Sequence, residues 1–173
     1  MRIAILADIH GNLPAFEAVL SHVHQQAPDL IIIAGDIVIG APDSAAGWQL
    51  AQSLGCPIVR GNHERYLGYF GTDQGDPAWQ SEQFAPVQWA VQQCTAQEKA
   101  TIAALPLTLR LPEAPDLLVV HASARSDREN LPPYTPDAQI AAMFPNVDER
   151  WIMRGHDHLA RTHPWRDKMI IHY

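Results

Sequence analysis

Five short, mostly apolar runs in this chain each lead directly into aspartate, asparagine or histidine, and this pattern constrains the fold more than any other feature. A short apolar run bounded by polar residues and glycine is typical of a buried strand. In open α/β sheets, functional side chains gather at the carboxyl ends of the strands. We therefore expect an α/β fold in which the polar residues meet along one edge. They lie in the segments Asp8-Ile9-His10, Gly35-Asp36, Gly61-Asn62-His63-Glu64, His121 and Gly155-His156-Asp157-His158.

The spacing of apolar residues predicts strands that alternate with helices in the first part of the chain. Residues 14–26 and 44–54 have the helical spacing, and residues 107–111 and 117–121 predict a hairpin. The predicted strands are 2–7, 30–34, 57–60, 107–111, 117–121, 150–154 and 169–172, and the predicted helices are 14–26, 44–54, 81–94, 95–105 and 136–144.

The composition is that of a soluble globular protein. With 173 residues, of which 47% are hydrophobic and 18% charged, the chain can form a sizeable core, and we expect a single domain over residues 1–173. No apolar run approaches the roughly 20 residues that cross a bilayer, and the start is typical of a strand, so we expect a cytoplasmic protein without a membrane partner. The formal net charge of −7 argues against sustained binding of long nucleic acid. Cys56 and Cys94 have no metal-type spacing, and we expect both to be reduced and structural.

The polar segments contain the donors that suit borderline divalent metals. Imidazole nitrogen and carboxylate or amide oxygen bind such ions, and a carboxylate such as Asp36 can bridge two of them. Taken singly, each segment has a simpler interpretation: a loop for Asp8 and His10, a turn for Asn62, and an edge histidine for His121. Together they favour a metal site. The remaining histidines lack patterned partners and are expected to be ordinary surface or edge residues: His22, His24, His163 and His172.

The ordered set Asp-x-His, Gly-Asp, Gly-Asn-His-Glu, His and Gly-His-x-His resembles the calcineurin-like metallophosphoesterase superfamily across nearly the whole chain. The stretch from Ala7 to Ala15 is similar to its small, single-domain bacterial and archaeal phosphodiesterase branch. The resemblance implies a four-layer α/β/β/α sandwich of two mixed β-sheets flanked by helices. It also implies a dinuclear metal-dependent phosphoesterase that hydrolyses phosphodiester bonds, with monoesters as a further class, in small or nucleotide-like substrates. A hydroxide bridging the two metals would be the nucleophile.

The resemblance further implies a role for each polar residue. His63 would protonate the leaving group or stabilise charge in the transition state, and its simpler interpretation is a positioning residue. The two divalent ions would be manganese or iron, although zinc, cobalt and nickel also accept such ligands. Asp8, His10 and His158 would hold the first metal, Asn62, His121 and His156 the second, and Asp36 would bridge them.

Two departures from the family pattern matter. Ile39 and Gly40 stand where the protein-phosphatase branch has a second acid and an arginine, which argues against a serine/threonine protein phosphatase. Members of the phosphodiesterase branch usually continue past the last histidine motif into further strands, whereas this chain stops at Tyr173. We therefore expect either a short sheet edge or a sequence truncated at its C-terminus.

For substrate contacts the sequence offers only candidates, and each has a solvated or core role as its alternative. Asn12 lies beside the first motif, and Arg125 and Arg128 follow His121. An arginine can grip a phosphate with two hydrogen bonds. The expected partner is a small phosphoester, and the oligomeric state stays open. A second function class is a metal-binding scaffold of the same fold that binds a protein partner without turnover.

Overall fold

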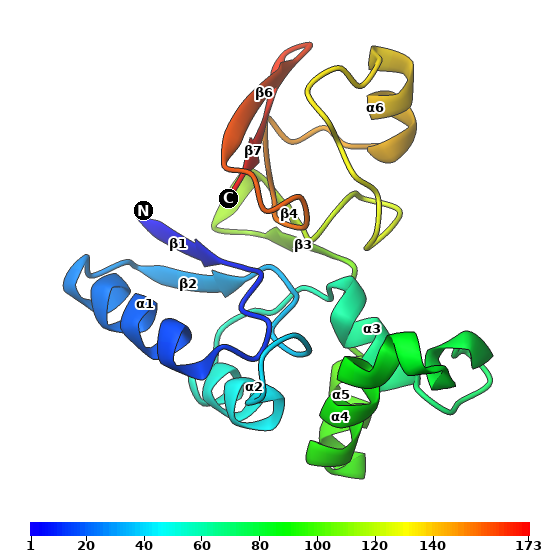
Figure 1. The fold of residues 1–173 in the computed structure, drawn as a ribbon. Helices are drawn as coiled ribbons and strands as arrows, with labels where there is room; N and C mark the ends of the chain where they lie inside the picture. The colour runs from blue at the N-terminus through cyan, green and yellow to red at the C-terminus, as the bar shows by residue number, and fades with distance from the viewer.

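Two β-sheets with flanking helices make up the computed structural model, which describes residues 1–173 (Figure 1). The smaller sheet pairs β1 (Ile3–Leu6) with β2 (Leu30–Ile33) in parallel. The strands of the larger sheet, in spatial order, are β3 (Thr108–Leu111), β4 (Ala114–Val120), β5 (Trp151–Arg154), β7 (Lys168–His172) and β6 (Arg161–Trp165). Its central strands β4, β5 and β7 are parallel, while β3 and β6 run antiparallel along its two edges.

Most helices lie where the apolar spacing predicts them. None is long and apolar enough to cross a membrane. The helices are α1 (Leu13–Gln25), α2 (Ser44–Ser53), α3 (Asn62–Tyr69), α4 (Ala85–Gln93), α5 (Ala96–Ala103) and α6 (Asp137–Met143), with short 3-10 turns η1 (Pro77–Gln80) and η2 (Glu82–Phe84).

Three local predictions were wrong or incomplete. Residues 57–60 do not form a strand, because only Ile58 bridges to β2 before the chain turns into α3. Helix α3 itself was not predicted, since its sequence is polar and its first turn depends on tertiary contacts. Strand β6 was also missed: Pro164 lies within it, and proline is tolerated only because β6 is an edge strand.

Three buried apolar clusters join the layers. Phe16 of α1 packs with Ile33 and with residues of α2 to α5 on the helical face of the smaller sheet. Ile32 and Val119 share a cluster between the two sheets. Ile140 of α6 is buried against β4, β5 and β7 on the far face of the larger sheet. This order of helices, sheet, sheet and helix confirms the predicted α/β/β/α fold class.

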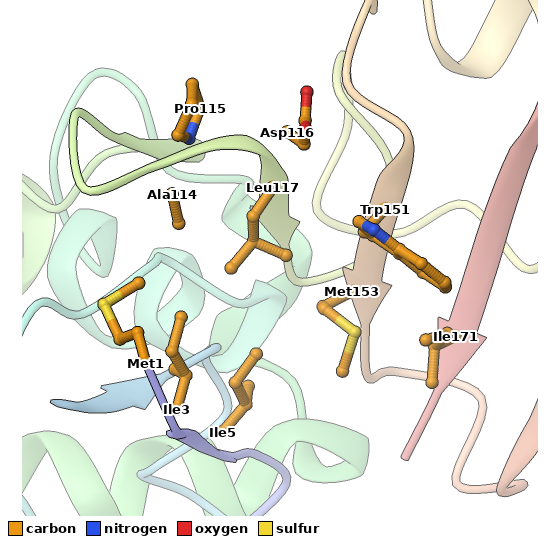
Figure 2. A pocket seen from close by; sticks show the side chains of 10 residues that line it. All are labelled: Met1, Ile3, Ile5, Ala114, Pro115, Asp116, Leu117, Trp151, Met153 and Ile171. Carbon is orange, nitrogen blue, oxygen red and sulfur yellow. The ribbon is translucent and has the colours of Figure 1, made fainter. Parts of the chain in front are cut away.

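An apolar cleft lies between the two sheets, near the beginnings of the strands (Figure 2). Its volume is about 400 Å³, and its walls include Ile3 and Ile5 of β1, Leu117 of β4, and Trp151 and Met153 of β5. The predicted metal ligands instead follow the ends of these strands. The cleft is therefore separate from the edge where the polar segments gather.

Candidate metal centre

The carboxyl ends of four strands bring the predicted ligands together. Asp8 follows β1, Asp36 follows β2, His121 follows β4, and the loop with His156 and His158 follows β5. Potential donor atoms lie within 4.8 Å of one another in three overlapping groups: Asp8, His10 and His158; His10, Asp36 and His63; Asp36, His121 and His156. Asn62 joins the last group, because its Oδ1 lies 3.3 Å from Nε2 of His121.

Asp36 lies at the centre of the cluster. Its Oδ2 is 3.8 Å from Nε2 of His10 and 3.3 Å from Nε2 of His121, so this one carboxylate contacts both sets of histidines. Burial alone would raise the pKa of Asp36, but His121 and His63 together outweigh burial and lower it. Burial opposes the charge on His121 as well, yet Asp36 raises the pKa of His121 to about 9. In the absence of metal the two therefore form a buried ion pair.

Backbone carbonyls orient the two inner histidines. Nδ1 of His121 donates to the carbonyl of Ala34 at 2.9 Å, and Nδ1 of His10 donates to the carbonyl of Ile39 at 3.0 Å. An imidazole that donates from Nδ1 presents Nε2 to a metal, as histidine ligands do in metal sites. Burial lowers the pKa of His10 and also of His156, which favours the neutral, ligating form of both rings.

The backbone is strained at most of these positions. Nine non-glycine residues have a positive φ, and five of them are predicted ligands. Such a conformation costs on the order of 1–3 kcal/mol per residue and persists only where the surrounding structure enforces it. The five, with φ between 52° and 70°, are Asp8, His10, Asp36, His156 and His158. The fold thus holds these side chains in place against local backbone preference.

The donor set fits divalent metal ions. Nε2 of His10 lies 3.1 Å from Nε2 of His158, and Asp8 Oδ1 lies 3.2 Å from the latter nitrogen. Because His10 already donates from Nδ1, its Nε2 is an acceptor in the neutral ring. Nε2 of His10 is thus available to a cation, and mixed imidazole and carboxylate donors suit manganese, iron or zinc.

A model of the calcineurin-like phosphoesterase family matches residues 1–160. The chain belongs to this family. A hypothetical protein of Pyrococcus horikoshii OT3 has a similar structure, with a TM-score of 0.83 and 17% identity over 99% of this chain and 75% of its own. A metallophosphoesterase of Sphaerobacter thermophilus gives a TM-score of 0.75 and 27% identity over the same shares. An uncharacterised protein of Methanocaldococcus jannaschii is 35% identical over 74 residues, which cover 43% of this chain and only 30% of that protein.

The family is one of metal-dependent phosphoesterases. The Asp and His groups described above could bind the metal. Gly35 and Gly61, which precede ligands, are required by close packing between these loops: a Cβ on Gly61 would lie 2.2 Å from Oδ1 of Asp36, and one on Gly35 would lie 2.8 Å from Nδ1 of His121.

His63 lies in the first turn of α3, next to the candidate metal centre. Its backbone N–H donates to Oδ1 of Asp36 at 2.9 Å. Its Nδ1 lies 3.2 Å from the carbonyl of Val38 and 3.1 Å from that of Ile39. Ile39 stands where the protein-phosphatase branch has an acid, and here its carbonyl accepts from both His63 and His10. Nε2 of His63 is therefore the nitrogen that can exchange a proton with a substrate.

Sequence reasoning gave no separate role to Glu64, a fully buried carboxylate in the same turn. Burial raises its pKa, yet all the groups that face its oxygens are N–H donors, which only the ionised form can accept together. These donors are the backbone N–H groups of Asp36 at 2.7 Å, Ile37 at 2.8 Å, Val38 at 3.3 Å and Gly61 at 2.8 Å. Glu64 thus ties the Gly35-Asp36 loop to the start of α3.

A second missed group supports the loop of His156 and His158. Asp157, between them, accepts from buried Arg154 at 2.5 Å and from Arg161 at 2.8 Å, and its Oδ2 lies 3.2 Å from Nδ1 of His172. The prediction that His172 is a surface or edge residue was wrong, because only 3% of it is exposed. Pairing of β5 with β7 sets His172 opposite Arg154, which no local pattern reveals.

The predicted substrate contacts lie in varied surroundings. Asn12 is exposed and caps α1, since its Oδ1 accepts from the backbone of Ala15 at 3.2 Å. Arg125 already pairs with Glu129 at 2.5 Å. Arg128 is exposed. A role in phosphate binding stays a prediction for all three.

Proposed function

We propose that this protein is a dinuclear metal-dependent phosphodiesterase that acts on small or nucleotide-like phosphoesters. The observation that carries the proposal is the position of Asp36, whose carboxylate contacts histidines of both predicted ligand sets. The first set would comprise Asp8, His10 and His158, and the second Asn62, His121 and His156. When bound, two divalent ions supply charge neutralisation for the phosphoryl oxygens and a water of lowered pKa.

The chain's own groups would do three things in this reaction. Asp36 and Glu64 hold the central loops at fixed separation through the backbone of α3. The carbonyls of Val38 and Ile39 keep Nδ1 of His63 protonated. In its imidazolium form, His63 would give the proton on Nε2 to the leaving oxygen of the ester and be left as the neutral ring protonated on Nδ1; general acid catalysis of this kind contributes about 10²–10⁴-fold in rate.

The test combines metal content with turnover. Four proteins are loaded with manganese: the parent, Asp36→Asn, His63→Ala and the control His22→Ala, which alters an exposed histidine of α1. Their metal content is measured by elemental analysis and their activity by hydrolysis of matched mono- and diesters. We expect two ions in the parent and in both histidine variants, fewer in Asp36→Asn, and a loss of turnover of about 10²-fold or more in His63→Ala.

Other results would overturn parts of the proposal. Two bound ions with no hydrolysis of any ester would favour the non-catalytic scaffold. A His63→Ala variant that turns over like His22→Ala would remove His63 from the chemistry. Absence of bound metal under every loading condition would refute the dinuclear centre itself.

A further inference from the structure

A second cavity opens directly beside the candidate metal centre. Its volume is about 380 Å³, and His156, a predicted ligand, forms part of its wall. The other walls come from two segments of the chain, residues 130–134 and residues 157–161, the second of which directly follows His156 in the sequence. Because His156 belongs both to the predicted ligand set and to the wall, the cavity adjoins the candidate metal centre.

Two large, exposed side chains border the cavity. Tyr134 is 85% exposed and Leu159 is 62% exposed, which places them among only six large hydrophobic side chains that are exposed in the whole chain. Much of the remaining wall is polar, so these two side chains offer apolar surface beside the candidate metal centre. A tyrosine ring offers a flat face to a planar ligand.

The wall is anchored before any ligand arrives. Thr135 closes a turn around Tyr134, because its backbone N–H and its hydroxyl both donate to the carbonyl of Pro132, at 3.0 Å and 2.7 Å. The carbonyl of buried Leu131 accepts from the guanidinium of Arg161. The loop of Tyr134 is thus tied to the segment that follows His158.

The charges in the wall are already paired. Arg161, the cation that lines the cavity, donates to Asp157 at 2.8 Å as well as to Leu131. A second phosphate would therefore meet no unpaired cation there. The amide of Asn130 and the ring of Tyr134 remain, and together they suit an uncharged planar group with hydrogen-bonding edges.

We propose that this cavity, the Tyr134 pocket, binds the planar ring of one ester group of the substrate, a nucleobase or an aryl ring. The proposal rests on the proposed phosphodiesterase function. Stacking on Tyr134 would provide most of the selectivity, since stacking of a base on an aromatic side chain is worth about 1–3 kcal/mol. Substrates without a ring in this position would bind at the metal centre alone.

The test compares three manganese-supported reactions that share the leaving group p-nitrophenol, with methyl, phenyl or thymidine 5′ as the second ester group. Tyr134→Ala is expected to raise KM for the phenyl and thymidine diesters about ten-fold relative to the methyl diester, with kcat nearly unchanged. Tyr134→Phe keeps the ring and should keep the parent KM. Trp89→Ala, which removes an exposed aromatic of α4, is the control. A larger effect on the thymidine diester identifies a nucleobase pocket, and equal effects identify a pocket for any planar ring.

Equilibrium dialysis of thymidine 5′-monophosphate with the same variants gives a second readout that needs no turnover. If the parent hydrolyses all three diesters and Tyr134→Ala leaves their KM ratios unchanged, the Tyr134 pocket is refuted and the phosphodiesterase stands. If the parent hydrolyses none of them but binds the nucleotide through Tyr134, the pocket stands and the proposed function is refuted.

Discussion

Glu64→Gln removes one charge from the most buried carboxylate near the metal centre and leaves its shape unchanged. In the parent, Oε1 accepts from the backbone of Ile37 and Val38, and Oε2 accepts from that of Asp36 and Gly61. A glutamine has one acceptor oxygen and one NH₂ group. Whichever way the amide is turned, its NH₂ faces two backbone donors, which lose their acceptor.

The magnitude follows from those two lost hydrogen bonds. A hydrogen bond to a charged group is worth about 1.5–3 kcal/mol, so the loss of two lowers the free energy of unfolding by about 3–6 kcal/mol. Total stability is typically about 5–15 kcal/mol, so the loss is a large fraction of it. For a protein of this size each kcal/mol lowers Tm by about 2–4 °C, and we expect a decrease of about 6–24 °C.

The assay is thermal and urea unfolding of metal-free protein at neutral pH, followed by circular dichroism. Glu98→Gln is the matched control, because Glu98 is an exposed acid that accepts the backbone N–H of Thr95 at the start of α5. Loss of such a cap costs only about 0.5–2 kcal/mol. If Glu64→Gln melts within about 2 °C of Glu98→Gln, Glu64 does not hold the loops together as described.

Three other perturbations test separate parts of the structure. Arg154→Lys is expected to weaken manganese binding about ten-fold or more in calorimetry. The planar guanidinium of Arg154 donates to the carbonyls of Ala122 and Glu129 and also pairs with Asp157 in the loop of His156 and His158, and a lysine cannot make all of these contacts. An unchanged affinity would contradict this. Burial raises the pKa of the Cys94 thiol from 9.0 to about 11. We therefore expect Cys94 to react with iodoacetamide about 100-fold more slowly in the folded protein than in the unfolded protein, as measured by mass spectrometry. Equal rates would exclude the buried position. Without metal, His121 has a pKa of about 9, so at neutral pH it holds a proton that the metal must displace. The apparent metal affinity is therefore expected to rise with pH up to about 9, and calorimetry in buffers of different ionisation enthalpy should show the proton release. A pH-independent affinity would speak against the ion pair of His121 and Asp36.

Local patterns were enough to predict where most of the predicted ligands would lie. Asp8, Asp36 and His121 each follow an apolar run, and parallel strands place their ends along one edge. The unpredicted helix α3 and the wrongly predicted strand at 57–60 have a common reason. Both depend on the turn at Gly61, whose N–H is satisfied by a buried carboxylate three residues later. A polar segment of this kind carries no periodicity that could reveal its tertiary partner.

The sequence by itself determined which donors are present, their order along the chain and the strand ends that carry them. Only the tertiary structure decided how those donors face one another. It holds Asp36 and His156 at positive φ, and it orients His121 through the carbonyl of Ala34, 87 residues away. It also buries His172 against Arg154 across a strand pair. The physical reason is that backbone strain and buried hydrogen bonds are balanced by partners from distant strands, and strand order leaves no trace in local spacing.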